Sequence, residues 1–391
     1  MTAGRSWWMC GRAVAVAAAI AVAGCNVVPA RMGEPPPPQA QGMAQIPGYA
    51  RIRTYGDAMI PSPSAPDELD QALHQRLASG ERLDLLALSG GGDAGAYGAG
   101  FLKGWSERGD RPEFAVVTGV STGALIAPMA FLGPAHDGAL ERFYTQTQAD
   151  DIYRLRILDV LGGASALADS GPLERRIAEV VTPDLVEAIA RERRKGRVLL
   201  IGTTDLDAQR QVIWDIGRIA ASGQPDRVAL IRRVLLASAS IPAAFPPVVF
   251  DVVRDGRFYQ ELHVDGGVTR GIFAYPANYP VPPKRGPRNM WLIRNSKLAP
   301  EWSATRATAV GIAERSIDTM IKSQYRGELR TIQQTAARDG FELRVTAVPP
   351  RFPVPYAKPF DPVYTRALYA VGLASGRSGR GWGTPAELGA P

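Results

Sequence analysis

Short apolar runs alternate with glycine-rich turns and helical segments in the middle of the chain. The run over 83–88 is almost continuously apolar, as expected of a parallel strand that is buried on both faces. A glycine cluster follows it, and then a helical segment that passes through 101–105. The order repeats with an apolar run over 114–121 and a helical segment over 122–132. This arrangement predicts an α/β sandwich with a mostly parallel central sheet.

The remaining sequence continues the α/β pattern and shows neither an internal repeat nor a second domain boundary. Residues 133–196 have a helical and irregular pattern, and 226–241 has the pattern of an amphipathic helix. Further strands are predicted at 197–206, 210–216, 246–253, 258–267, 288–296 and 341–348.

The N-terminus has the pattern of an export signal. Arg5 and Arg12 precede an apolar run over 13–25 that ends in Val-Ala-Gly-Cys. This run of about a dozen residues is too short to span a bilayer and has the length of a signal-peptide core. The small residues closing on Cys25 resemble the lipobox of bacterial lipoproteins, in which cleavage leaves a lipidated cysteine. We therefore predict a signal peptide over 1–24 and lipidation of Cys25, with an ordinary secretory signal as the alternative.

Cysteine use and composition support an exported, tethered domain. Cys10 and Cys25 are the only cysteines, so cleavage would leave a mature protein without an internal disulfide. Residues 25–66 are rich in proline and small polar residues, a composition that buries too little apolar surface to fold. The sequence therefore predicts a flexible tether over 25–66 and a folded domain over 67–391.

The net charge of +7 does not indicate a nucleic-acid-binding protein. The excess is spread thinly, and 191–197 is the only dense basic run. We interpret this run as a solvated helix end rather than as a nucleic-acid patch. A basic surface would also suit an anionic membrane.

Gly119, Ser121 and Gly123 form the pattern G-x-S-x-G where the second predicted strand meets its helix. Glycines on both sides of the serine allow the strained turn that presents a nucleophile in many hydrolases. The helix that follows places free N–H groups beside Ser121, where they can stabilise an anion. The alternative is a plain strand-to-helix turn with an incidental serine.

The glycine cluster over 90–95 allows two interpretations. It matches the dinucleotide fingerprint G-x-G-x-x-G, but the next strand runs into the serine turn instead of ending in a ribose-binding acidic residue. We favour an oxyanion hole, in which backbone N–H groups approach a tetrahedral intermediate closely because glycine lacks a side chain.

Asp265 is the candidate proton acceptor for Ser121. It ends a predicted strand and is followed by Gly266 and Gly267. A carboxylate bonded directly to the serine hydroxyl can act as the base without histidine, because burial raises its pKa above the usual value of about 3.9. The alternative is a plain turn after the strand.

The chain has three histidines, and only one of them lies near a motif. His74 and His136 lie outside the motifs, so we interpret them as surface residues. His263 precedes Asp265 by two residues, which places both side chains on the same face of a strand. Three roles are open to His263, namely a base, a substrate contact or a partner of another polar group, and we favour a non-catalytic role.

Together, and in this order, the glycine loop, the G-x-S-x-G turn and the D-G-G turn resemble the patatin-like phospholipase family. A further block of that family matches ASASIPAAFPPV over 237–248. The resemblance covers about residues 83–382 and implies a three-layer α/β/α sandwich.

The resemblance implies a Ser-Asp dyad in which Ser121 is the nucleophile and Asp265 the base. It implies an oxyanion hole from the amides of Gly90, Gly91, Gly92 and Thr122. The family needs no metal or cofactor for this chemistry. Many members carry a basic residue where this chain has Ala94, preceded by the acidic Asp93, which leaves open how the oxyanion charge is balanced here.

We therefore expect a membrane-tethered serine acyl hydrolase of the phospholipase A, lysophospholipase or esterase type. Its expected partners are a lipid ester substrate and the membrane surface of a bacterial envelope, and Asn26 after the lipidated cysteine favours the outer membrane. Residues 133–196 are the candidate cap over an apolar acyl groove. No feature indicates a nucleic-acid partner or an oligomeric state. The alternatives are an inactive lipoprotein that binds lipid or protein on a hydrolase scaffold, and a dinucleotide-dependent enzyme.

Overall fold

The computed structural model describes residues 31–57, 74–76, 78–155, 168–276, 279, 281–302, 304–354, 356, 358–385 and 387. The signal peptide predicted over 1–24 and the lipidation site at Cys25 lie outside these residues. The strands are β1 (Arg53–Tyr55), β2 (Leu83–Leu88), β3 (Val116–Val120), β4 (Arg154–Leu155), β5 (Ala168–Asp169), β6 (Val198–Asp205), β7 (Arg210–Asp215), β8 (Val248–Arg254), β9 (Arg257–Asp265), β10 (Arg288–Arg294) and β11 (Glu342–Ala347). The helices are α3 (Gly95–Arg108), α4 (Thr122–Leu132), α5 (Asp137–Gln146), α7 (Gly171–Val180), α8 (Pro183–Arg194), α9 (Ile216–Ala221), α10 (Arg227–Ser238), α11 (Ala309–Arg338) and α12 (Pro362–Ser378).

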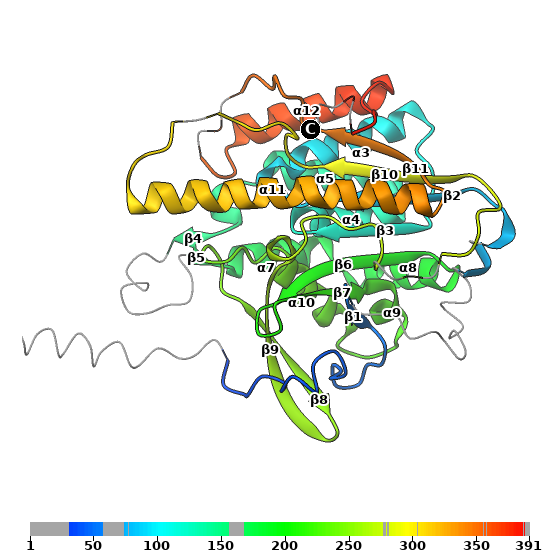
Figure 1. Cartoon of the computed structure of the whole chain (residues 1–391), viewed down its shortest axis with the longest axis vertical. Helices are drawn as coiled ribbons and strands as arrows, with labels where there is room; N and C mark the ends of the chain where they lie inside the picture. Colours follow the sequence, from blue (N-terminus) through cyan, green and yellow to red (C-terminus); the bar gives the residue numbers. More distant parts are fainter. Residues whose placement is uncertain are drawn as a thin grey trace, which may run out of the picture.

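A nine-stranded sheet forms the centre of the domain (Figure 1). Its middle consists of parallel strands in the order β6–β3–β2–β10–β11. Beyond β6, strands β7 and β1 extend the sheet in antiparallel pairing. The β8–β9 hairpin joins the C-terminal part of β6, also antiparallel. The mostly parallel central sheet predicted from the apolar runs is thus confirmed.

Both faces of the parallel strands are buried, which explains why their sequences are continuously apolar. In β2, Leu86 and Leu88 belong to the hydrophobic core on one face, whereas Leu85 and Ala87 belong to the core on the other. Helices α3, α4, α5, α7, α8, α9, α10 and α12 contribute to the first core, and α11 covers the second (Figure 1). The architecture is therefore the expected three-layer α/β/α sandwich. No helix in the described ranges has the length and apolar character needed to cross a membrane.

The described part of the segment predicted as a tether is packed against the domain, so the prediction of a flexible chain is wrong for 31–57. Strand β1 pairs with β7, and Gln45 forms a bridge with Val253 of β8. Arg53 makes a buried ion pair with Glu261, at 3.0 Å between Nη2 and Oε1. Apolar side chains such as Ile52 are buried in the core. The scattered apolar residues of this segment give it a surface to bury, which its proline content did not indicate.

The segment predicted as a cap, 133–196, forms part of a helical layer in its described residues. Helix α5 packs against α3 and α12, and α8 packs against α9 and α4. Apolar residues on the inner sides of these helices, among them Leu140 and Ile189, are fully buried in the main core. These helices therefore stabilise the sandwich instead of forming a separate cover over the serine.

Candidate active site

Ser121 occupies a sharp turn between β3 and α4. Its backbone has φ 55° and ψ −126°, a strained conformation for a residue with a side chain, and α4 begins at the next residue. A Cβ on Gly119 would collide with the carbonyl of Gly123, and a Cβ on Gly123 would collide with the carbonyl of Leu88. The two glycines of G-x-S-x-G are therefore required by close backbone packing, which confirms the predicted turn.

Ser238 holds this turn in place, a role that the sequence motifs did not reveal. The N–H of Ser121 donates to Ser238 Oγ at 3.0 Å, and the Ser238 hydroxyl donates to the carbonyl of Gly202 at 2.7 Å. All three groups are buried. Ser238 lies in the block 237–248, whose likeness to the family was visible but whose contact with the serine was not.

The topology of β6 brings Asp265 beside Ser121. Strand β3 pairs with β6 as far as Val120 and Gly202, and β9 pairs with β6 from Thr203 and Asp265 onward. The end of β9 thus takes the place beside β6 that β3 leaves at Ser121. Gly266 is needed here as well, because a Cβ on it would press into the Gly202 carbonyl.

The Asp265 carboxylate is buried and hydrogen-bonded on one oxygen. Its Oδ1 accepts the N–H of Gly267 at 2.7 Å, and its own N–H donates to the carbonyl of Ser240 at 2.8 Å. Burial raises the pKa of Asp265 to about 6, while the Ser121 hydroxyl and the Gly267 amide act to lower it. Within the described residues, Oδ2 has no hydrogen bond of ordinary geometry. The Ser121 hydroxyl thus lies near enough to influence the carboxylate, although no hydrogen bond of ordinary geometry joins it to Oδ2.

The glycine loop approaches Ser121, but its three glycines differ in what their amides can do. The N–H of Gly90 donates to the carbonyl of Gly271 at 2.9 Å, so the prediction that it faces an oxyanion is wrong in this arrangement. The amides of Gly91 and Gly92 donate to no group in the described part of the chain. Gly92 has φ 59°, and a Cβ on Gly91 would collide with the backbone of Asn295. Gly91 and Gly92 are therefore the loop amides that remain free to bind an anion.

A hydrogen bond to the backbone explains how the loop accommodates the acidic Asp93 beside Ala94. The buried Asp93 carboxylate accepts the N–H of Phe360 at 2.9 Å, which fixes the segment leading into α12. Burial raises the pKa of Asp93, and its hydrogen bonds partly offset this effect. Its charge is thus engaged by the Phe360 amide.

Comparison with known proteins agrees with this geometry. The model of the family "Patatin-like phospholipase" matches residues 86–278, which contain Ser121, Asp265 and most of the motifs described above. The chain belongs to the patatin-like phospholipase family. Among solved structures, the chain is similar to VipD from Legionella pneumophila, with 12% identity, a TM-score of 0.36 and coverage of 93% of this chain and 72% of that chain. The comparison with curated proteins gave no match.

In this patatin-like domain, the ring nitrogens of His263 have hydrogen-bond partners other than Ser121 and Asp265. Its Nδ1 lies 2.8 Å from Thr203 Oγ1, and its Nε2 lies 3.0 Å from Glu261 Oε2. The ring is fully buried and contacts the rings of Trp214 and Phe250. Because both ring nitrogens have partners, the structure supports the expectation that His263 binds another polar group.

Glu261 and His263 also lie near Asp205, in a cluster of potential metal ligands. The guanidinium of Arg53 pairs with Glu261, and the hydroxyl of Tyr55 donates to Asp205 at 3.2 Å. Burial alone would raise the pKa of Glu261, but the charge of Arg53 and the bond to His263 lower it to about 2. We interpret the cluster as a buried polar network that attaches the N-terminal segment to β9.

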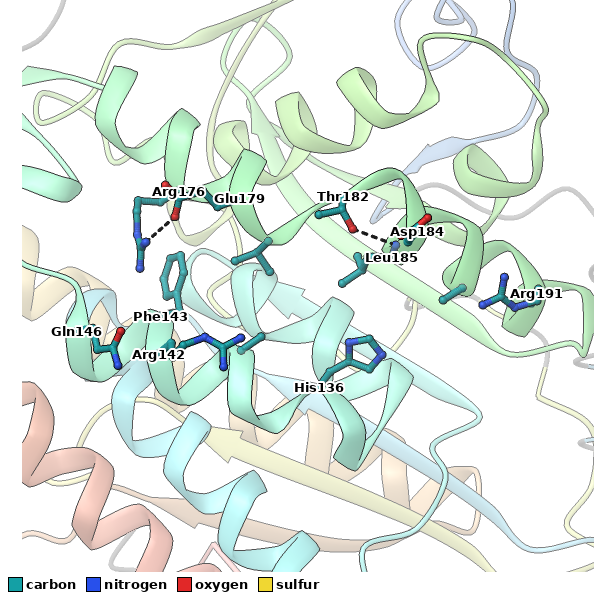
Figure 2. A pocket seen from close by; sticks show the side chains of 13 residues that line it. His136, Arg142, Phe143, Gln146, Arg176, Glu179, Thr182, Asp184, Leu185 and Arg191 are labelled. Atoms are coloured by element: carbon teal, nitrogen blue, oxygen red, sulfur yellow. Dashed lines mark hydrogen bonds and ion pairs between the residues drawn. The ribbon is translucent and has the colours of Figure 1, made fainter.

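A cavity of about 480 Å³ lies between α5, α7 and α8, and Figure 2 shows its lining. Its side chains include His136 and Arg142 on one side and Glu179, Leu185 and Arg191 on the other. None of its lining residues belongs to the serine turn, the glycine loop or the D-G-G turn. The predicted acyl groove is therefore not this cavity. His136 is half-buried at its edge, and His74 is exposed.

Because the pKa of Asp265 is raised, ionisation of this residue lowers the stability of the folded chain. An uncharged residue at this position should avoid that loss. The unfolded chain ionises Asp265 at its ordinary pKa of 3.8 and the folded chain at about 6, so stability falls as the pH rises through this window. The variant Asp265→Asn should therefore be more stable than the unchanged protein at pH 7.5, by up to about 3 kcal/mol, and should gain nothing at pH 4. Urea unfolding at both pH values measures the difference. An equal effect at the two pH values, or a loss at pH 7.5, would contradict the buried charge; the exposed Asp251→Asn serves as the control.

Proposed function

We propose that this protein is a serine hydrolase of lipid acyl esters, of the phospholipase A, lysophospholipase or esterase type. Lipid acyl hydrolysis in general follows from membership of the patatin-like phospholipase family. The observation that supports the specific mechanism is the strained Ser121 turn beside a buried Asp265 whose pKa is about 6. Dinucleotide chemistry is disfavoured, because the strand after the glycine loop ends in this turn.

In the first half of the proposed reaction, Ser121 Oγ attacks the carbonyl carbon of the ester and transfers its proton to Asp265. The carbonyl oxygen becomes an oxyanion, which the amides of Gly91, Gly92 and Thr122 would bind. Thr122 is the first residue of α4, so its N–H has no partner one helical turn earlier. When the tetrahedral intermediate collapses, the C–O bond to the alcohol breaks and Asp265 returns its proton to that alcohol. The products of this half are the alcohol and an acyl-Ser121 ester.

In the second half, water replaces the alcohol. Asp265 accepts a proton from the water as its oxygen attacks the acyl-Ser121 carbonyl, and the same amides bind the second oxyanion. Collapse of this intermediate breaks the bond to Ser121 Oγ, which takes the proton back from Asp265. The fatty acid is released and both side chains return to their starting states.

The environment of Asp265 suits this role. A carboxylate of ordinary pKa is a very weak base, whereas a pKa of about 6 leaves Asp265 mostly ionised at neutral pH and more basic than an exposed aspartate. His263 is assigned a positioning role, because Glu261 and Thr203 bind its ring nitrogens.

The assignment of Ser121 predicts selective loss of reactivity. Ser121→Ala should lower ester hydrolysis by more than about a thousandfold and abolish covalent labelling by a fluorophosphonate, because Ser121 is the proposed carrier of the acyl group. Hydrolysis of a soluble ester and gel detection of the label measure both effects. Ser323→Ala, an exposed serine on α11, should behave like the unchanged protein. Labelling that persists in Ser121→Ala would refute the assignment, and an unchanged protein that neither reacts nor hydrolyses would favour the inactive lipid-binding scaffold.

The proposed role of Asp265 as the base predicts how the reaction rate depends on pH. Because Asp265 must be ionised to accept a proton, kcat/KM should rise with pH around a midpoint of about 6 and level off above it. The pH–rate profile of soluble ester hydrolysis measures this midpoint. The same midpoint should persist in His263→Gln. Its disappearance in that variant would replace the dyad with a triad.

We further propose that the domain is attached to the bacterial envelope, with the outer membrane favoured, through a lipid on Cys25. The support is the apolar run over 13–25 and its resemblance to a lipobox. Bacteria expressing the full chain should incorporate labelled palmitate into the protein, and Cys25→Ser should abolish incorporation. Cys10→Ser is the matched control, because cleavage would remove Cys10. Incorporation that persists in Cys25→Ser would contradict the proposal.

A further inference from the structure

Helix α11 lies on the face of the sheet opposite to most helices, and its described side chains are buried only in its C-terminal half. Tyr325, Leu329, Ile332 and Ala336 recur at helical spacing and are buried in the second core. Figure 1 shows that the N-terminal half of α11, drawn in yellow, projects beyond the strands of the sheet. The helix is therefore longer than the surface that it covers.

The apolar stripe of α11 continues into the projecting half, where it is exposed. Ile321 and Ile317 precede Tyr325 by one and two steps of four residues, and Met320 lies beside them. Their side chains are 41%, 57% and 67% exposed, respectively. Large apolar side chains gathered on one exposed helix face are typical of a contact surface.

Trp302 extends this surface. Its side chain is 91% exposed. The neighbouring Glu301 is attached to α11, since its carboxylate pairs with Lys322 and its carbonyl accepts a hydrogen bond from Arg315. These contacts hold Trp302 near the projecting half of the helix. An exposed tryptophan beside an apolar helix face is characteristic of proteins that insert at a membrane interface.

The same helix contacts the loop that follows Asp265. Gln324 Nε2 donates to the carbonyl of Thr269 at 2.7 Å, and Glu328 Oε1 accepts the N–H of Gly271 at 3.0 Å. In this loop Val268 is 44% exposed. The helix that bears the exposed stripe is thus bound to the loop that follows the proposed base.

We propose that the exposed stripe of α11, formed by Ile317, Met320 and Ile321 together with Trp302, docks onto the surface of a lipid bilayer. This inference rests on the proposed function, because it names the surface from which the ester reaches Ser121. The feature that favours a bilayer is the exposed Trp302 beside the apolar face, because the amphipathic ring of tryptophan suits the interface between membrane and water. Long cationic side chains can lie along such a surface while the apolar face inserts.

Docking can be measured without hydrolysis on the full chain carrying Ser121→Ala. With Cys10→Ser and Cys25→Ser, a single reporter cysteine can be placed at will, because the chain has no others. An environment-sensitive NBD label at Met320→Cys should shift to the blue and brighten about twofold or more on adding phosphatidylcholine–phosphatidylglycerol vesicles, because the label enters an apolar layer. The matched label at the exposed Thr319→Cys, which is on the same helical turn but faces away from the middle of the stripe, should change little.

The fluorescence of the label distinguishes docking onto lipid from association of the stripe with a second copy of the chain. No change at position 320 with vesicles, or equal changes at 319 and 320, would overturn the proposal. A blue shift that appears without vesicles as the protein concentration rises would also overturn it, in favour of a second copy of the chain.

Hydrolysis of vesicle phospholipid and of a soluble ester tests the docking surface independently of the label. In the chain with an intact Ser121, Ile317→Ser combined with Met320→Ser should lower hydrolysis of vesicle phospholipid by about tenfold or more, because two apolar side chains that would enter the bilayer are replaced by polar ones. Hydrolysis of a soluble short-chain ester should stay within about twofold, since the substitutions lie away from the serine turn. Equal losses on both substrates would contradict docking. If the unchanged protein hydrolyses neither substrate, the proposed function fails while the label still reports on docking.

Discussion

The site depends on a change of partner along β6. This strand pairs with β3 as far as Gly202 and with β9 from Thr203 onward, so one strand replaces the other at the point where Ser121 leaves the sheet. The replacement brings together two residues that are 144 positions apart in the sequence. It also requires close backbone approach, which Gly119, Gly123 and Gly266 permit. The motif glycines are therefore required by the packing of the sheet edge, whatever they contribute to the proposed reaction.

The same packing places Asp265 where water is largely excluded, and this has two opposite effects. Burial raises the pKa of Asp265, which suits its proposed role as a base, but ionising a buried carboxylate destabilises the fold. The surrounding structure compensates: Ser238 fixes the serine turn, Ser240 accepts the Asp265 amide, and Arg53 holds β9 through Glu261. The N-terminal segment is thus part of the support for the site.

The sequence was sufficient to predict the sandwich and the serine turn, because each depends on local patterns with strong backbone requirements. The proximity of Ser121 and Asp265 was expected only from the resemblance of the ordered motifs to the family, since the two residues are far apart in the sequence. The sequence was not sufficient for features that depend on distant contacts. Whether the Gly90 amide is free depends on Gly271, and the role of Ser238 depends on its distance from Ser121. The packing of 31–57 was missed because proline content outweighed its scattered apolar residues. The sequence pattern of 309–338 did not indicate helix α11, because charged residues stand between the apolar residues of its stripe.

The central claim is that a serine and a buried aspartate perform the reaction over free backbone amides. A crystal structure of the fluorophosphonate adduct tests it most directly. We predict a covalent bond to Ser121 Oγ, a phosphonyl oxygen within about 3 Å of the Gly91 and Gly92 amides, and Asp265 at hydrogen-bond distance from the serine oxygen. An adduct on another residue, or one in which His263 leaves Glu261 and contacts Ser121 while Asp265 stays remote, would contradict the account.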